Sequence, residues 1–436
     1  MQNTAIPWIG SIPCEWKLIR IKNTSWLKGR IGWDGLQSKE FVDNGPYLIT
    51  GTDFFNGKVN WSSCVHITKE RYDEDELLHI KEGDLLITKD GTIGKLAIVE
   101  NCPNEVSLNS GVMIIRNNSE FSYDNRYMYY VLSSDEFWLW FNINQKPNST
   151  IQHLYQHQFG EFKFAYPLIS EQMAIARYLD NKCDDIDNSI SRHQQIIEKL
   201  EEYRKSVITQ AVTKGLDPNA EMKDSGNHLL GNIPADWVMK RLRNVAAIVR
   251  GGSPRPIDQY ITDGDGYNWI KIGDATGNGK YITSTKQKII KEGLSKTRIV
   301  NPGTLLLTNS MSFGHPYILQ ITGCIHDGWL AFSDYREMIP EYLYYYLMAE
   351  PTMVQFKSSV DGSVVQNLNI DKVKNAIIVC PSLTEQKAIV SYLDTVGGQV
   401  DESIKKHAEI IEKLKEYKQS IIYNAVTGKI DCRVTE

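Results

Sequence analysis

A long internal repeat constrains the fold of this chain more than any other feature of its sequence. Residues 171–218 read EQMAIARYLDNKCDDIDNSISRHQQIIEKLEEYRKSVITQAVTKGLDP, and residues 385–432 read EQKAIVSYLDTVGGQVDESIKKHAEIIEKLKEYKQSIIYNAVTGKIDC. The two segments align without a gap, and 24 of the 48 positions are identical. Self-similarity over this length indicates a chain built from two related structural units.

Fainter matches extend the repeat towards the N-terminus. They pair GSIPCEW at 10–16 with GNIPADW at 231–237, GDLLITKDGTIGK at 83–95 with GTLLLTNSMSFGH at 303–315, and STIQHL at 149–154 with SVVQNL at 363–368. The helical segments stay alike while the segments before them diverge, which is typical of a shared scaffold that carries two specificities. We therefore expect a globular domain over 1–170, a helical region over 171–215, a second globular domain over 216–384 and a second helical region over 385–436.

Apolar residues recur in both helical regions at alternating steps of four and three, the spacing of a heptad seam. The seam consists of Ile186, Ile190, His193, Ile197, Leu200 and Val207 in the first region, and of Val400, Ile404, His407, Ile411, Leu414 and Ile421 in the second. We expect the two helices to pack along each other as a coiled coil, although a plain packing hairpin within one fold is the alternative. Ile196 and Tyr203, with Ile410 and Tyr417, widen the apolar face enough to receive a partner helix.

The ends of the first helix are also marked in the sequence. The stretch DNKCDD at 180–185 predicts a break after Leu179, with Asp184 and Asp185 as caps of the main helix. Gly215 and Pro218 are expected to end it. The main helix would then have about thirty residues and a length of ~45 Å.

Short β-rich runs and short helical stretches alternate in both globular segments, which indicates an α+β fold. We expect two tandem mixed α/β domains separated by two long helices. If a pseudo-two-fold axis relates the repeats, those helices form an antiparallel coiled coil.

Composition excludes several classes of protein. The chain is 42% hydrophobic and 23% charged, and it has no run of eighteen apolar residues, so we expect no membrane-spanning helix. The N-terminus lacks the pattern of a secretory signal, and the seven cysteines form no CxxC pair, which favours the cytoplasm. The net charge is −5, so any nucleic-acid site must be a local basic patch.

Four Gly-rich loops carry polar or basic residues: KGRIGWDG at 28–35, KDGTIGK at 89–95, RGGSPR at 250–255 and NSMSFGH at 309–315. Glycine lets the backbone approach a phosphate closely, and Arg or Lys neutralises the phosphate or reads guanine. Gln152 and Gln366 follow short runs of small residues, and glutamine can pair with adenine through two hydrogen bonds. Each loop could also be an ordinary surface loop.

Catalytic patterns are missing from the sequence. There is no GxGxxG after a strand, no Asn/Asp-Pro-Pro-aromatic motif for base methylation, no paired-carboxylate nuclease site and no metal-ligand spacing. We therefore expect no catalysis and no metal site in this chain.

Taken together, these motifs resemble the specificity subunit of type I restriction–modification enzymes. The resemblance covers essentially the whole chain and rests on GxIPxxW at 10–16 and 231–237, GDLLITKDGTIGKLAIV at 83–99, RGGSPR at 250–255, and the blocks YPLISEQMAIARYLD at 166–180 and CPSLTEQKAIVSYLD at 380–394, each followed by IIEKL. It implies that each globular domain is a target-recognition domain that reads one half of a bipartite DNA site.

The resemblance also implies partners and cofactors. The paired helices would set the gap in the DNA site and dock two modification subunits, which carry S-adenosylmethionine and methylate adenine. Two restriction/translocase subunits would join for cleavage with ATP and Mg²⁺. None of these cofactors would bind this chain. A ~45 Å helix would place two domains roughly 10–13 base pairs apart, near one turn of duplex.

Carried over to this sequence, the resemblance predicts DNA-contacting residues in the loops of both domains. They are Lys28, Arg30, Lys89, Thr92, Ser149, Thr150 and Gln152 in the first domain, and Arg250, Ser253, Arg255, Asn309, Ser310, Ser363 and Gln366 in the second. The second domain departs from the family form at NSMSFGH and VDGSVVQNL.

Two functions of other classes compete with this one. The first is a self-sufficient restriction endonuclease, against which the missing catalytic motifs argue. The second is a scaffold or adaptor that binds proteins but not DNA, which the acidic net charge favours.

Overall fold

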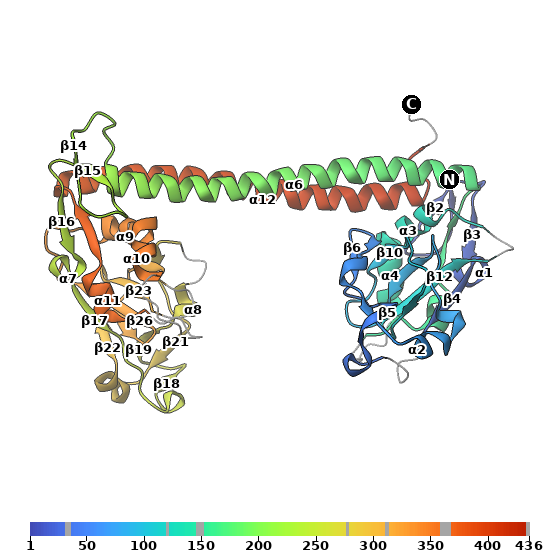
Figure 1. Cartoon of the computed structure of the whole chain (residues 1–436), viewed down its shortest axis with the longest axis horizontal. Coiled ribbons are helices and arrows are strands. Elements are labelled where there is room, and N and C mark those ends of the chain that lie inside the picture. The colour runs from blue at the N-terminus through green and yellow to red at the C-terminus, as the bar shows by residue number, and fades with distance from the viewer. Residues whose placement is uncertain are drawn as a thin grey trace. The chain divides into compact units, whose positions relative to one another are not determined.

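The computed structural model of the chain describes residues 1–30, 36–118, 122–144, 152–275, 279–309, 314–357 and 368–432 (Figure 1). The chain divides into two compact units. The first unit comprises Met1–His193 together with Glu409–Glu436, and the second comprises Gln194–Ala408. Each unit therefore holds one globular domain and a part of each long helix.

The globular part of the first unit is built on a six-stranded sheet of order β4-β12-β9-β10-β7-β6, with a three-stranded sheet β11-β5-β8 and the pairs β13-β3 and β1-β2. Its elements are β1 Gln2–Asn3, β2 Ser11–Ile12, β3 Lys17–Arg20, α1 Ile21–Thr24, β4 Ser25–Gly29, β5 Val42–Ile49, β6 Phe54–Phe55, β7 Lys58–Val59, β8 Val65–His66, α2 Lys69–Asp73, β9 Leu85–Thr88, β10 Leu96–Ile98, β11 Val106–Leu108, β12 Val112–Asn117, α3 Asn125–Ser133, α4 Asp135–Asn144, α5 Gln156–Phe159 and β13 Lys163–Tyr166.

The second unit repeats this plan with sheets β17-β26-β23-β24-β20 and β18-β21-β19-β25-β22 and the pairs β16-β27 and β14-β15. Its elements are β14 Met222–Asp224, β15 Asn232–Pro234, β16 Val238–Arg241, α7 Leu242–Val245, β17 Ala247–Arg250, β18 Ile261–Thr262, β19 Tyr267–Ile270, α8 Ile272–Ala275, β20 Tyr281–Ile282, β21 Gln287–Ile289, β22 Arg298–Val300, β23 Leu305–Thr308, β24 Pro316–Leu319, β25 Gly323–Ile325, β26 Trp329–Ser333, α9 Pro340–Met348, α10 Glu350–Lys357, α11 Ile370–Asn375 and β27 Ile377–Cys380.

The central strands show why these residues form a buried sheet. All four residues of β9 and of β23 are buried. Because side chains alternate across a strand, Leu85 joins the core that includes α3 and α4 while its neighbour Leu86 joins a second core on the other face. Leu305 and Leu306 divide in the same way in the second unit. The LLIT and LLLT runs of the sequence are thus strands covered on both faces.

Two long helices complete the fold. Helix α6 is continuous from Ile169 to Lys214, and α12 runs from Leu383 to Val426. The predicted break after Leu179 is therefore wrong. Asp184 and Asp185 lie in the middle of α6 with exposed side chains, where water satisfies their carboxylates and no cap is needed. Gly215, with φ +78°, follows the last helical residue, as predicted.

The helices pair in antiparallel fashion. In the first unit Lys418 Nζ contacts Asp187 Oδ2 at 2.6 Å, and in the second unit Arg204 pairs with Asp401. Residue numbers rise along α6 while those of its partners on α12 fall, which defines an antiparallel coiled coil.

None of the ten aliphatic residues of the seam is exposed. Those that are buried are Ile186, Val400, Ile411 and Ile421, and those that are half-buried are Ile190, Ile197, Leu200, Val207, Ile404 and Leu414. His193 and His407 are also half-buried. In contrast, Ile196, Tyr203, Ile410 and Tyr417 are exposed.

One buried tyrosine in each unit joins the globular domain to the C-terminal part of a long helix. Tyr127 Oη donates to the carbonyl of Ala165 at 2.7 Å and also lies 3.2 Å from the carbonyl of Val426. Tyr342 Oη makes the equivalent contacts in the second unit, to Val212 at 3.1 Å and to Val379 at 3.3 Å. Both side chains are fully buried.

A buried glutamine near the start of each long helix also joins that helix to its globular domain. Gln172, fully buried, accepts a hydrogen bond from the backbone of Asp124 and donates to the carbonyl of Pro167. Gln386 accepts from Ile339 in the second unit and donates to Pro381. The glutamine of the EQ dipeptide that the two repeats share therefore fixes the start of each long helix to its domain.

Candidate nucleic-acid interface

A tight loop between β9 and β10 carries several of the predicted contact residues of the first domain. Thr88 Oγ1 donates to the carbonyl of Thr92 at 2.5 Å and accepts from Lys95 N–H at 2.9 Å. Lys89 N–H donates to the carbonyl of Gly111, and Leu154 N–H donates to the carbonyl of Lys89. These bonds tie together three chain segments that are far apart in the sequence.

The second domain builds the same frame at equivalent positions. His315 N–H donates to Thr308 Oγ1 at 2.8 Å, Asn309 N–H to the carbonyl of Gly328, and Leu368 N–H to the carbonyl of Asn309. Gly94 and Gly314 both hold positive φ (+80° and +70°) at the end of this loop, a conformation that glycine adopts without strain. The backbone of the loop is thus constant, while the side chains on it differ.

In the first domain, the predicted contact residues lie in different environments. Lys28 pairs with Asp75 at 3.1 Å, and Lys89 pairs with Asp90 at 3.0 Å. Arg30 is only 3% exposed and donates Nε to the carbonyl of Leu108 at 3.2 Å, so its guanidinium supports the interior of the domain.

Thr92, within the loop between β9 and β10, and Gln152, two residues before Leu154, are both exposed. His153, which follows Gln152, pairs with Asp90. Ser149 and Thr150 lie outside the described residues.

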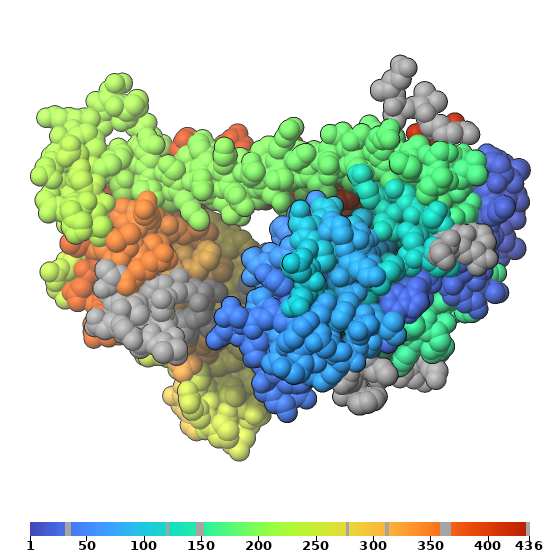
Figure 2. All heavy atoms as spheres, turned by 45° about the vertical axis from the view of Figure 1, so that its right-hand side comes forward, coloured from blue at the N-terminus to red at the C-terminus, as the bar shows by residue number. Residues whose placement is uncertain are grey.

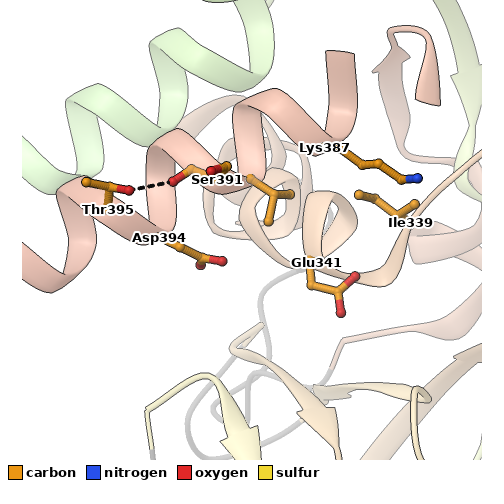
Figure 3. Close-up of a pocket in the computed structure, with 7 residues that line it drawn as sticks. Ile339, Glu341, Lys387, Ser391, Asp394 and Thr395 are labelled. Carbon is orange, nitrogen blue, oxygen red and sulfur yellow. Dashed lines mark hydrogen bonds between the residues drawn. The ribbon is translucent and has the colours of Figure 1, made fainter. Parts of the chain in front are cut away.

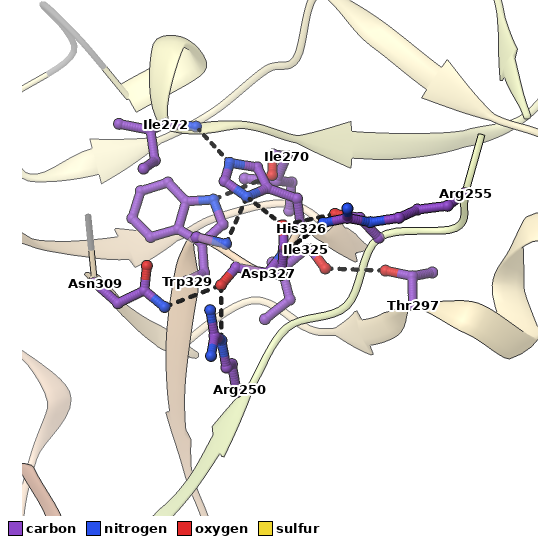
Figure 4. A network of polar contacts seen from close by, with 12 residues as sticks. Arg250, Arg255, Ile270, Ile272, Thr297, Asn309, Ile325, His326, Asp327 and Trp329 are labelled. Carbon is purple, nitrogen blue, oxygen red and sulfur yellow. Dashed lines mark hydrogen bonds and ion pairs between the residues drawn. The ribbon is translucent and has the colours of Figure 1, made fainter. Parts of the chain in front are cut away.

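In the second domain, four of the predicted contact residues converge on one residue, Asp327, in the turn between β25 and β26 (Figure 4). Its carbonyl accepts from Arg250 Nε at 3.0 Å and from Asn309 Nδ2 at 2.9 Å. Its carboxylate accepts from Ser253 Oγ at 2.8 Å and pairs with Arg255 at 3.4 Å. Ser310, Ser363 and Gln366 lie outside the described residues.

The turn that carries Asp327 is held by its neighbours. Gly328 N–H donates to Nδ1 of His326 at 2.7 Å, and Trp329 Nε1 donates to the carbonyl of Ile270 at 3.1 Å. Burial lowers the pKa of His326, so this imidazole is neutral at pH 7. Although partial burial acts in the opposite direction, the hydrogen bond from Ser253 and the nearby positive charges lower the pKa of Asp327, which is therefore ionised.

The surroundings of Asp327 are basic. Arg250 and Arg298 are exposed, and the side chain of Arg255 is 80% exposed. Lys271 and Arg255 line a surface pocket of about 500 Å³ whose wall also includes Trp269 and Asp327. This cluster is a local basic patch in a chain whose net charge is negative, and exposed arginines of this kind suit phosphates and guanine edges.

Sequence reasoning missed Asp327 and, in the first domain, Asp90 and His153. For Asp327 the signal was indirect: HDG at 326–328 and NSG at 109–111 occupy equivalent places in the two repeats, and Ser-Gly and Asp-Gly mark tight turns. Asp90 lies inside the KDGTIGK loop and His153 directly follows Gln152. Nothing in the sequence shows that four distant side chains meet at one of these turns.

A second pocket lies next to a long helix. It has a volume of about 660 Å³ and lies between α9 and α12. Figure 3 shows that Glu341 and Asp394 reach toward the same opening and that Lys387 lies at its edge. Asp394 of α12 accepts a hydrogen bond from Tyr345 of α9 and forms an ion pair with Lys280. It therefore joins α12 to the globular domain. Within the described ranges, no three His, Cys, Asp or Glu side chains come together as a metal site. No helix in those ranges is long and apolar enough to cross a membrane.

Comparison with known proteins agrees with this arrangement. The family model described as "Type I restriction modification DNA specificity domain" matches residues 32–202 and 234–416. The chain is 26% identical over 442 residues to the putative type I restriction enzyme MjaX specificity subunit of Methanocaldococcus jannaschii, covering 97% of this chain and 95% of that protein. It is 26% identical over 360 residues to the EcoBI specificity subunit of Escherichia coli, covering 80% and 73%.

Solved structures share the fold. A chain from a structure titled for the complex assembly and conformational transition of the type I R-M system aligns with a TM-score of 0.75 and 17% identity, covering 96% of this chain and all of that one. The HsdS subunit from Thermoanaerobacter tengcongensis aligns with a TM-score of 0.56 and 18% identity, covering 99% and 100%. Since the family model matches both repeats, this chain belongs to the type I restriction modification DNA specificity family, as a specificity subunit.

Proposed function

We propose that this chain is the sequence-specific DNA-binding subunit of a type I restriction–modification complex and that each globular domain reads one half of a bipartite target. The observation that carries the proposal is the constant loop frame with unlike side chains. Lys89 and Asn309 occupy the same backbone position, as do Ser110 and Asp327, because Thr88 pairs with Val112 where Thr308 pairs with Trp329. Two domains that read different half-sites need the same loop backbone with different side chains on it, and this is the arrangement seen here.

The paired helices serve as spacer and docking surface in this proposal. Ile196 and Tyr203, and their repeat equivalents Ile410 and Tyr417, are exposed on α6 and α12. Figure 2 shows side chains of α6, in green, at the molecular surface. Exposed apolar residues at helical spacing suit a partner helix, so we assign this surface to two modification subunits.

Catalysis belongs to the partners in this proposal. The modification subunits supply S-adenosylmethionine chemistry, and two restriction/translocase subunits use ATP and Mg²⁺. This chain binds none of these cofactors and acts on DNA in the cytoplasm. Its own contribution is to choose the sequence and to hold the partners on it.

Sequencing base modification in native host DNA, with and without this gene, tests the proposal. We expect a methylated-adenine motif in two parts with an unspecified gap, present only when the gene is intact. If the purified complex with its modification subunits also fails to prefer any duplex over a scrambled one, the chain is a scaffold that binds proteins and the proposal is wrong.

Arg255→Ala is expected to weaken binding to the second half-site only. The side chain is largely exposed and its ion pair with Asp327 is long, so its removal leaves the core intact. Removing a side chain that reads a base costs about 1–3 kcal/mol and relaxes one position of the target. Competition binding with single base-pair variants of both halves measures the effect. Arg243→Ala, also exposed and in the same unit but on α7 outside the loop cluster, is the control for loss of one charge.

A further inference from the structure

The carboxylate of Asp327 lies where a DNA-binding surface would ordinarily avoid negative charge. Its side chain is 43% exposed and lies among the cations Arg250, Arg255 and Lys271. An anion near DNA phosphates opposes binding, because every duplex presents the same dense negative charge. An aspartate in the middle of a basic patch therefore weakens DNA binding unless it also has a favourable effect.

The geometry indicates what this role is. Asp327 holds Arg250 through its carbonyl and Arg255 through its carboxylate, while Ser253 donates to Oδ1 and also accepts from the backbone N–H of Asp327. A free arginine side chain samples many rotamers, and most of them can reach a phosphate. A carboxylate that pairs with the guanidinium favours the directions in which a base edge of the correct kind accepts its hydrogen bonds.

The first domain provides an internal comparison. Its equivalent turn carries Ser110 in place of Asp327, and Gly29 stands where the second domain has Arg250, since Gly29 pairs with Met113 as Arg250 pairs with Leu330. Asp327 and Arg250 thus occur together in one repeat, and both residue types are missing from these positions in the other. Residues that change as a set within a constant frame are those that distinguish the two domains.

We infer that Asp327 is a specificity-determining residue of the second domain: its carboxylate positions Arg255 for one half-site and penalises the use of Arg250 and Arg255 as general phosphate contacts. This inference rests on the proposed function. It predicts two effects of opposite sign when the carboxylate is removed. Discrimination at the second half-site falls, while affinity for unrelated DNA rises because one negative charge is gone.

Asp327→Ser tests the inference, because serine occupies the equivalent turn of the first domain and is therefore compatible with it. The complex with its modification subunits is assayed against three duplexes of equal length: the bipartite target found by methylation sequencing, the target with its second half scrambled, and the target with its first half scrambled. We expect preference for the correct second half to fall about 10- to 100-fold, with preference for the first half unchanged. Binding to the duplex with the scrambled second half should tighten.

Asp258→Asn is the matched control. Asp258 lines the same pocket, is exposed, and within the described residues forms no ion pair or side-chain hydrogen bond. Its loss changes the net charge equally, so it should tighten binding to all three duplexes without altering preference.

Each outcome decides a separate question. A parent complex that discriminates none of the duplexes contradicts the proposed function. If the parent discriminates but Asp327→Ser does so equally well, or if the variant loses both halves together, the inference about Asp327 is overturned. Asp327→Glu, which keeps the charge, should retain more of the preference than Asp327→Ser if positioning is the cause; equal losses would leave no role for the carboxylate.

Discussion

Tyr342→Ala is expected to lower the free energy of unfolding of the second unit by about 3–5 kcal/mol. The side chain is fully buried in the core that joins α9 to both long helices, so its removal leaves a large cavity. It also leaves the carbonyls of Val212 and Val379 without the hydroxyl that donates to them. This tyrosine therefore stabilises the domain and its junction with α6 at once.

Two further variants separate these contributions. Tyr342→Phe keeps the ring and removes only the hydroxyl, so a loss of about 1–3 kcal/mol is expected for the unpaired carbonyls. Tyr392→Ala removes an exposed tyrosine of α12 and should change stability by at most about 0.5 kcal/mol. Urea unfolding followed by hydrogen exchange in Gln194–Ala408 measures all three. Equal midpoints for Tyr342→Ala and Tyr392→Ala would contradict the role of the junction.

Glu136→Leu is expected to stabilise the first unit, and the gain should grow as the pH rises. Glu136 lies in α4, is fully buried, and neither carboxylate oxygen has a hydrogen-bond partner among the described residues. Burial raises the pKa of Glu136 well above its usual 4.5. The folded state thus holds a proton that the unfolded state releases.

The direction of the pH effect follows from this difference. Below the pKa that Glu136 has in the unfolded chain, the ionisation leaves the free energy of unfolding unchanged. Above that pKa, the free energy of unfolding falls by up to about 1.4 kcal/mol for each pH unit, until the pH reaches the pKa that Glu136 has in the folded protein. Unfolding free energies of the parent, Glu136→Leu and Glu136→Gln between pH 5 and pH 8 measure the effect. Both variants should remove this slope, and only leucine also removes the unpaired polar atoms. The second repeat has Pro351 at the equivalent buried position of α10, so an apolar residue suits this site. A parent slope equal to that of Glu136→Leu would contradict the assignment.

The sequence predicted the helices far better than the loops, and the reason is physical. Spacing along a helix determines which side chains share a face, so Ile186 and Val400 could be placed on one seam from their numbers alone. The predicted break failed because Asp184 and Asp185 are poor helix formers only by a few tenths of a kcal/mol, which packing of α6 easily outweighs.

The DNA-contacting residues were predicted from their residue type and from the loop that carries them. These two properties do not determine whether a side chain is buried or exposed. Arg30 and Arg255 looked alike in sequence, yet the first is buried against the carbonyl of Leu108 and the second is exposed beside Asp327. This difference depends on which distant segments meet, and no local pattern records it. Whether these residues touch DNA stays a prediction.

The division of the chain has a consequence for the order of its biosynthesis. The core of the first unit includes Ile421 and Val426, so this unit cannot close until α12 has been made. The whole of Gln194–Ala408 is translated in between, which takes roughly 10–40 s at ordinary ribosomal speeds. The second unit, which is contiguous, is complete when Ala408 emerges. The N-terminal part of the polypeptide is therefore synthesised first but is the last to finish folding. Until α12 packs against it, its apolar core residues remain exposed to chaperones and proteases.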